Sequence, residues 1–92
     1  MYIVDSTKGY RRAYKRVSKH KNFDRQVFED IIDTLSRGEK LSSRHQDHQL
    51  TGEFQDYREC HVKNDILLMY QKHEDILVLM LIKLGTHDDL FR

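Results

Sequence analysis

Three apolar segments, separated by two short polar turns, fill most of the second half of the chain. They span residues 54–62, 66–71 and 76–84, and the sequences KND and KHED separate them. Turns this short join antiparallel strands, because a parallel connection needs a crossover of about a dozen residues. The sequence therefore predicts a three-stranded antiparallel meander, with the aliphatic run LVLMLIKL in its third strand.

Helical patterns dominate the first half. Residues 7–20 place apolar side chains at helical spacing among basic ones, and residues 27–35 carry a clearer apolar stripe that Gly38 ends. Either Asp24 or Asn22 can cap the start of the second helix. We therefore predict two helices before the meander.

The remaining segments complete the predicted architecture. YIV, within residues 1–5, indicates a short strand, and Phe23 is placed to pack on Phe28 as a hydrophobic staple. Residues 39–53 are polar and irregular and are predicted to form a long loop of the kind that often carries function. Two helices followed by strands predict an α+β fold with both helices on one face of the sheet. The length of 92 residues predicts one domain, residues 1–92.

Several protein classes are excluded by the composition. The amino terminus is polar within five residues, unlike a signal peptide, and the longest aliphatic run is about half the length of a membrane helix. We therefore expect no membrane association. One cysteine, Cys60, excludes an internal disulfide and fits a reducing cytoplasm. Cys60 and His61 should point to opposite faces of their strand, so Cys60 is predicted to be a buried apolar residue.

Charge is distributed unevenly along the chain. The net charge is +1, but residues 1–22 hold seven basic residues and one acidic residue, a balance of +6, which leaves −5 for the rest. A basic segment of this density favours a polyanion such as RNA, although a solvated helix face is the alternative. The candidate RNA-binding residues are Lys8, Arg11, Arg12, Lys15, Arg16 and Lys19.

Histidines are frequent, with six in the chain, and three of them follow or end predicted elements. His48 stands late in the loop, His61 ends the first meander strand and His87 follows the third. The ends of the first and third strands of a meander lie at one edge of the sheet, where Asp65 opens the second strand. We therefore expect these four residues to converge once the loop folds over the sheet. His45 has no evident constraining neighbour, and no function is expected of it.

Two imidazoles and a cation are sufficient for RNA cleavage. Unperturbed imidazoles titrate near pH 6.5, so one can accept a proton while another donates one. RNA supplies its own nucleophile, the 2′-hydroxyl, so no metal or cofactor is required. Lys83, the one charge in the third strand, is the candidate that stabilises the extra negative charge of the phosphorane.

Other interpretations of these residues stay open. A zinc site is disfavoured because the usual closely spaced ligand pair is absent, and the histidines could also be surface residues without a task. Tyr57, Arg58 and Glu59 could contact RNA or form ordinary cross-strand pairs, the latter being favoured for Glu59.

The carboxyl-terminal residues also allow two interpretations. Phe91 could stack on a base or anchor the tail to the sheet. Thr86 and Asp89 match a capping pattern for a short terminal turn, which would fix the orientation of His87.

The sequence DHQLTGEFQDYRECHVKNDILLMY, followed by KLGTHDDLF, resembles the YafQ-like branch of the RelE superfamily, the toxins of bacterial type II toxin–antitoxin pairs. The resemblance runs from Gln46 to the end of the chain. It implies a microbial ribonuclease fold, in which a twisted antiparallel sheet carries two helices on one side and a cleft on the other. It also implies an mRNA interferase that cuts translated mRNA in the ribosomal A site, leaving a 2′,3′-cyclic phosphate and a 5′-hydroxyl.

The resemblance also implies roles for individual residues. The family's functional histidines fall on His48, His61 and His87, its acidic residue on Asp65 and its terminal aromatic residue on Phe91. We expect His87 to be the general acid and His48 or His61 to be the base. Asp65 would orient an imidazole, Lys83 would hold the phosphate, and the basic helix would attract ribosomal RNA.

Three positions depart from the family pattern. Lys83 replaces an arginine and so lacks the bidentate fork that fits a phosphate. Ile66 replaces a tryptophan, and Gln49 replaces a proline. These departures leave a catalytically weak or inactive RNA-binding member as an alternative, beside a metal-dependent hydrolase. The implied partners are the ribosome, mRNA and a small antitoxin, expected to be a ribbon-helix-helix protein, that supplies the contacts to DNA.

Overall fold

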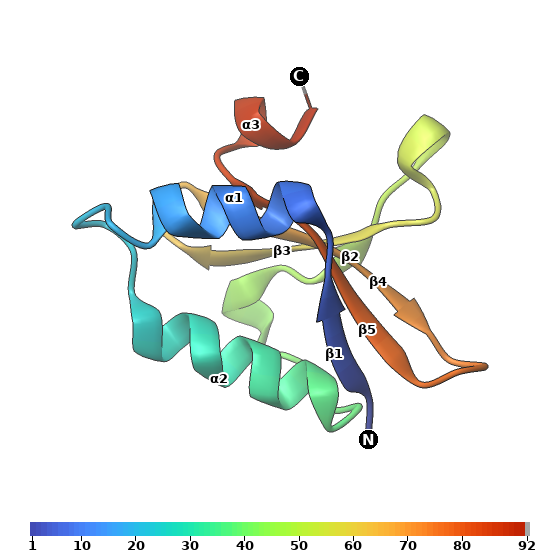
Figure 1. The fold of residues 1–92 in the computed structure, drawn as a ribbon. Helices are drawn as coiled ribbons and strands as arrows, with labels where there is room; N and C mark the ends of the chain where they lie inside the picture. Colours follow the sequence, from blue (N-terminus) through green and yellow to red (C-terminus); the bar gives the residue numbers. More distant parts are fainter. Residues whose placement is uncertain (92) are drawn as a thin grey trace.

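The computed structural model describes residues 1–91, which form one sheet and three α-helices (Figure 1). The elements follow in the order β1 (Ile3–Ser6), α1 (Lys8–Val17), α2 (Arg25–Ser36), β2 (His48–Gln49), β3 (Arg58–Lys63), β4 (Ile66–His73), β5 (Val78–Gly85) and α3 (His87–Phe91). Two single 3-10 turns, Ser43–His45 and Gly52–Phe54, flank β2. The predicted α+β class is confirmed.

The five strands lie in the order β1-β5-β4-β3-β2. Strands β2 to β5 are antiparallel to their neighbours, as the short turns predict, whereas β1 runs parallel to β5. The sheet is therefore mixed and not wholly antiparallel. The two helices supply the long connection that a parallel pair requires, because the chain leaves β1 through α1 and reaches β5 only after crossing the rest of the sheet.

Helices α1 and α2 pack on one face of the sheet, as predicted, and bury the main core there. Their contribution comes from the apolar stripes seen in the sequence, and the strands contribute every second residue. The buried members are Tyr10, Val17, Phe28, Ile31, Leu35, Cys60, Val62, Ile66, Leu68, Tyr70, Leu79, Leu81 and Leu84.

The start of α2 matches its sequence signals closely. The Asp24 carboxylate accepts a hydrogen bond from the Val27 amide at 3.1 Å, so Asp24 and not Asn22 is the N-cap. Phe23 packs on Phe28 with ring centroids 5.5 Å apart, which confirms the staple. Lys63 donates to Asp24 at 3.0 Å. This bond, with the amide contacts, lowers the pKa of the Asp24 carboxyl.

Residues 39–53 contain more regular structure than predicted. They hold a 3-10 turn and the short strand β2, and a second 3-10 turn at Gly52–Phe54 follows. As a result β3 begins at Arg58, four residues later than the apolar pattern indicates. The apolar side chain of Phe54, which suggested a strand, packs instead with the small cluster on the other face of the sheet.

Cys60 lies in the core, as predicted. Burial, with a smaller effect of nearby Asp47, raises the pKa of its thiol, so it stays neutral and is no nucleophile. None of the helices formed by residues 1–91 is both long and apolar enough to span a bilayer.

Candidate active site

The face of the sheet away from α1 and α2 carries a row of polar side chains. The strand register places His48 opposite Glu59, Glu59 opposite Met69, and Met69 opposite Lys83. Residues opposite one another in neighbouring strands project from the same face. Because Cys60 points into the core under the helices, Glu59 and this whole row belong to the opposite face, which we call the open face.

A second row lies next to the first on the open face. His61 is opposite Leu67, which is opposite Gly85. His87 begins α3 two residues beyond Gly85, and Asp65 lies exposed in the turn between β3 and β4. The register thus brings His61, Asp65 and His87 to the same end of the sheet, the arrangement expected from the meander.

His48 has a defined orientation. Its Nδ1 lies 2.6 Å from the carbonyl oxygen of Gln46. A carbonyl only accepts hydrogen bonds, so Nδ1 carries the hydrogen and, in the neutral ring, Nε2 carries the lone pair. Nε2 lies 3.6 Å from Oε1 of Glu59, and the His48 side chain is about half exposed. This tautomer is the one that a general base needs.

Glu59, for which the sequence favoured an ordinary cross-strand pair, is paired across the strands with His48 on the open face. It is 5% exposed, and its Oε2 accepts no hydrogen bond from any residue in the range 1–91. A buried carboxylate oxygen without a hydrogen-bond partner is costly, and such groups concentrate at functional sites. The alternation of side chains along β3 already indicates this position in the sequence. Cys60 and Val62 face the core, so Glu59 and His61 project together from the opposite face.

Lys83 is held between the sheet and α3. Its ammonium donates to the Leu90 carbonyl at 3.0 Å. The turn that leads there is fixed by the predicted capping pattern, in which the Thr86 amide donates to Asp89 at 2.9 Å and the Asp89 amide to Thr86 at 3.4 Å. Gly85 permits this approach, because a Cβ at that position would lie 2.5 Å from the Asp89 carboxylate.

Phe91 is an anchor of the terminal helix. The centroid of its ring lies 4.8 Å from the ring centroid of His87 and 5.1 Å from that of Phe54, which it meets edge to face. The Phe91 side chain is half-buried. Leu90 beside it is completely buried against Leu67 and the rest of the small apolar cluster. The imidazole of His87 is therefore exposed, but the helix α3 that carries it is held in place by the packing of Leu90 and Phe91.

The prediction that nothing constrains His45 is wrong. His45 is buried, and its Nδ1 donates to the His61 carbonyl at 2.7 Å. The 3-10 turn Ser43–His45 packs against β3 and brings the ring there. Sequence spacing did not reveal this contact because the turn and β3 meet only in the folded chain.

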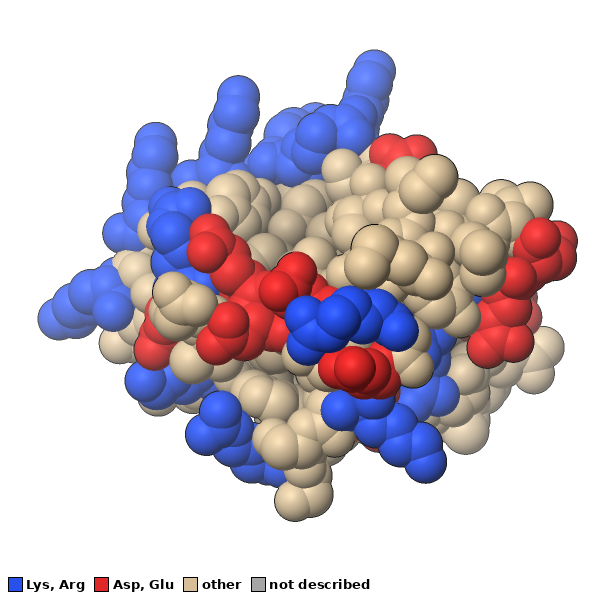
Figure 2. Space-filling model, turned by 90° about the horizontal axis from the view of Figure 1, so that it is seen from below, with Lys and Arg blue, Asp and Glu red and all other residues tan. Residues whose placement is uncertain are grey.

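The predicted RNA-binding residues of the first helix are all exposed. They are Lys8, Arg11, Arg12, Lys15, Arg16 and Lys19, the last just beyond the end of α1. In Figure 2, seen from the side of α2, several Lys and Arg side chains extend from the upper rim and others lie along the left and lower edges, while acidic side chains gather near the middle of the face.

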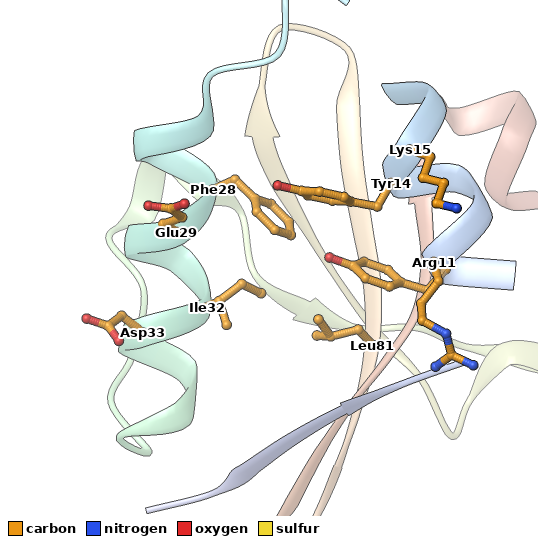
Figure 3. A pocket seen from close by; sticks show the side chains of 9 residues that line it. Arg11, Tyr14, Lys15, Phe28, Glu29, Ile32, Asp33 and Leu81 are labelled. Carbon is orange, nitrogen blue, oxygen red and sulfur yellow. The ribbon is translucent and has the colours of Figure 1, made fainter. Parts of the chain in front are cut away.

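Between α1 and α2 lies an open groove of about 620 Å³ (Figure 3). Rings from both helices and Leu81 of β5 line it, and Arg11 and Lys15 stand on its α1 side. The Tyr14 hydroxyl accepts a hydrogen bond from Arg25 at 2.8 Å. The groove opens on the helix side of the sheet, away from the histidines.

A metal centre is not preformed in the described part of the chain. Residues 1–91 include no group of three or more His, Cys, Asp or Glu side chains arranged to hold an ion.

Comparisons with known proteins identify close likenesses. Residues 2–92 match the family described as the bacterial toxin of type II toxin–antitoxin system, YafQ. A putative toxin YafQ of Haemophilus influenzae is 48% identical over 31 residues, which cover 34% of this chain and 30% of that protein. The chain thus matches about a third of that relative's length.

Solved structures share the fold over almost the whole chain. A copper-bound mutant toxin from Helicobacter pylori superposes with a TM-score of 0.90 and 33% identity, covering 99% of this chain and 100% of the other. The toxin in the Escherichia coli DinJ–YafQ toxin–antitoxin complex superposes with a TM-score of 0.83 and 25% identity, covering 99% and 98%. With the family match over residues 2–92, these likenesses establish that the chain belongs to the YafQ family of type II toxin–antitoxin toxins.

Proposed function

We propose that this toxin is a ribosome-dependent endoribonuclease that cleaves translated mRNA in the A site without a metal ion. The observation that carries the proposal is the placement of His48, His61 and Lys83 on one open face of the sheet, with His87 at its end. In a member of a toxin family, this arrangement supports a reaction in which these side chains would serve as base, acid and cation.

The proposed reaction is a transesterification within the RNA. His48 Nε2 takes the proton of the 2′-hydroxyl, and the 2′-oxygen bonds to phosphorus. The bond from phosphorus to the 5′-oxygen then breaks, and His87 gives that oxygen a proton. The products are a 2′,3′-cyclic phosphate and a 5′-hydroxyl. The Glu59 carboxylate, 3.6 Å from His48 Nε2, stabilises the imidazolium formed when the base is protonated.

Lys83 and Asp65 take supporting roles in this proposal. After its bond to the Leu90 carbonyl the Lys83 ammonium keeps two N–H donors, which can stabilise the charge that develops on the phosphorane. Lysine does so as a point charge without the fork of arginine. Asp65, at the same end of the sheet as His61, would orient an imidazole.

Contact with ribosomal RNA is assigned to the exposed cations of α1 and Lys19. Phosphate contacts of this kind are independent of sequence and weaken as salt concentration rises. Phe91, half-buried beside His87, would contribute a ring edge near the scissile nucleotide.

A cognate antitoxin is proposed as the partner that restrains the toxin. The DinJ–YafQ complex of E. coli supports this class of partner, and the apolar groove between α1 and α2 offers a place for one amphipathic helix. Because α1 carries basic side chains along the groove, the flank of that helix facing α1 should be acidic. The antitoxin would also supply the DNA contacts of the complex.

Binding of the antitoxin in the groove can be tested with two isoleucines. Ile32→Glu puts a charge among the apolar side chains of the groove and should weaken binding of the cognate antitoxin by about tenfold or more. Ile76, 64% exposed in the turn between β4 and β5, is the matched control. Equal affinity of both variants, measured by calorimetry, would place the antitoxin elsewhere.

Cleavage itself is tested by mapping 5′ ends on translated mRNA after induction of the toxin. New 5′-hydroxyl ends within codons, and none on an untranslated copy of the same message, are the expected result. A toxin that arrests translation without producing ends would be a ribosome-binding protein, the alternative that Lys83 and Ile66 favour.

A metal-dependent hydrolase is the second candidate, favoured by the copper-bound and metal-bound toxin structures from H. pylori. The two candidates differ in their response to a chelator. Cleavage by purified toxin on programmed ribosomes, with the magnesium that ribosomes need kept constant, should be unaffected by a chelator selective for transition metals. Loss of cleavage, restored by copper or zinc, would favour the metal-dependent reaction.

A further inference from the structure

Asp47, Arg58 and Tyr70 form a closed set of polar contacts next to β2. The Tyr70 hydroxyl donates to Asp47 Oδ1 at 2.5 Å, and Arg58 Nη2 pairs with Asp47 Oδ2 at 3.2 Å. Arg58 Nε also donates to the Tyr70 hydroxyl at 3.3 Å. Each of the three side chains therefore contacts the other two.

These contacts are largely withdrawn from solvent. Tyr70 is completely buried, and the side chains of Arg58 and Asp47 are 29% and 17% exposed. Burial, followed by the bond to Asp47, raises the pKa of the Tyr70 phenol, so the hydroxyl remains a donor. Ion pairs taken out of water add little net stability, but a satisfied polar network fixes one geometry.

The network lies on the helix side of the sheet, and the reaction proposed above uses none of its members. Arg58 is opposite Tyr70 in the register, and Tyr70 belongs to the core under α1 and α2. Asp47 reaches this side from the residue immediately before β2. The network thus joins the segment that carries His48 to β3 and to β4, the middle strand of the sheet.

Strand β2 needs such support because it is short. It consists of two residues at the edge of the sheet, His48 and Gln49, which within residues 1–91 pair with β3 alone. Gln49 is also held by side-chain bonds: its amide donates to the Tyr57 carbonyl at 3.0 Å, and Arg58 Nη1 donates to its oxygen at 3.4 Å. The segment is anchored on both sides of His48.

Anchoring Asp47 determines where His48 points. Neighbouring residues of an extended segment project to opposite faces, so an Asp47 side chain held on the helix side directs the imidazole to the open face. There, Gln46, in the left-handed region at φ 46°, presents its carbonyl to His48 Nδ1 at 2.6 Å. Rotation of the segment would break this hydrogen bond, and the neutral imidazole could then carry its hydrogen on either nitrogen.

We propose that Asp47, Arg58 and Tyr70 are positioning residues that hold the His48 imidazole, from behind the sheet, in the orientation and tautomer of a general base. This inference rests on the proposed function in assigning His48 the role of base. The network itself touches no substrate.

The test combines NMR with single-turnover cleavage on programmed ribosomes. In wild-type toxin the ¹⁵N shifts of His48 should report hydrogen on Nδ1 in the neutral ring. Tyr70→Phe, which removes one oxygen, and Asp47→Asn should each give a mixture of tautomers. Both should lower the cleavage rate by about 10- to 100-fold, the size of effect that misplacement of a catalytic group produces, while affinity for ribosomes is unchanged.

The control is Glu39→Gln, which removes an exposed ion pair with Arg37 at 3.1 Å that includes no member of the network and should leave both readings unchanged. Folded variants that keep the wild-type tautomer and a rate within about twofold would overturn the proposal. Should Tyr70→Phe fail to fold, Asp47→Asn carries the test, because its side chain reaches solvent. If wild-type toxin cuts no RNA, the proposed function fails, and the ¹⁵N shifts alone decide whether the network positions His48.

Discussion

The two faces of the sheet differ in what their side chains do. The face under α1 and α2 buries an apolar core drawn from both helices and three strands. The open face has a smaller buried cluster, Leu67, Met69 and Leu90, among which lie a buried carboxylate and an ammonium. The same strands supply both sets of residues, because successive side chains along a strand point to opposite faces. A core residue and a candidate catalytic residue can therefore be neighbours in the sequence.

This separation has a practical meaning for mutations. Outside the network of Asp47, Arg58 and Tyr70, a substitution on the covered face should lower the free energy of unfolding and leave the chemistry of the folded molecules intact. A substitution of a polar residue on the open face should do the reverse. Each of the following changes tests one side of this comparison.

The largest effect is expected for His87→Ala. Removing the proposed general acid should lower the rate of RNA cleavage by about 10²- to 10⁴-fold and abolish growth inhibition. His87 is exposed, so the melting temperature should stay at the wild-type value. His20→Ala, at an exposed histidine beyond the end of α1, is the control. If cells producing the His87 variant still arrest, the assignment of this residue is wrong.

Leu68→Ala tests the covered face. Leu68 is completely buried in the main core, and replacing such a leucine costs about 2–5 kcal/mol of unfolding free energy. Urea denaturation followed by circular dichroism measures the loss. Cleavage per folded molecule should match wild type, and a variant that is stable but inactive would contradict the division between the faces.

Glu59→Gln tests the opposite expectation. The substitution removes the charge that faces His48 and should slow cleavage by about tenfold, the lower range for a group acting on a catalytic base. A buried charge without full hydrogen bonding does not stabilise the fold, so the free energy of unfolding should be unchanged or higher. A marked loss of stability in urea would make Glu59 a structural residue.

The smallest effect concerns Asp24 and pH. Because Lys63 and the Val27 amide lower its pKa in the folded state, the stability this carboxylate contributes is present above the unfolded pKa, near 3.8. It is lost as the pH falls through the lower folded value. An asparagine side chain can still accept the capping bond, so Asp24→Asn should flatten only the acid end of the stability profile. An unchanged profile below about pH 4, by thermal melts, would refute this.

Local sequence signals predicted the local structure well. The Asp24 cap, the Phe23 staple and the Thr86–Asp89 capping pattern all depend on residues within five positions of one another. The meander was also predictable, because two short turns leave few alternatives.

Contacts between distant segments were not predictable in the same way. The parallel pairing of β1 with β5 and the bond from His45 to His61 depend on how the chain returns after many residues. The cross-strand pair favoured for Glu59 is confirmed, but its partner His48 was not predictable, because β2 and β3 come together only through the register. The position of His61, Asp65 and His87 at one end of the sheet was predictable because it follows from the strand order of the meander.

Thr7 links the start of α1 to strand β5 through hydrogen bonds of its side chain. Its hydroxyl accepts the capping bond from the Tyr10 amide at 3.0 Å and donates to the Ile82 carbonyl at 2.9 Å. Ile82 immediately precedes Lys83, at the irregularity between β4 and β5. The first turn of the basic helix is therefore joined through one hydroxyl to the backbone next to Lys83, so the start of α1 and this part of β5 hold a fixed position relative to each other.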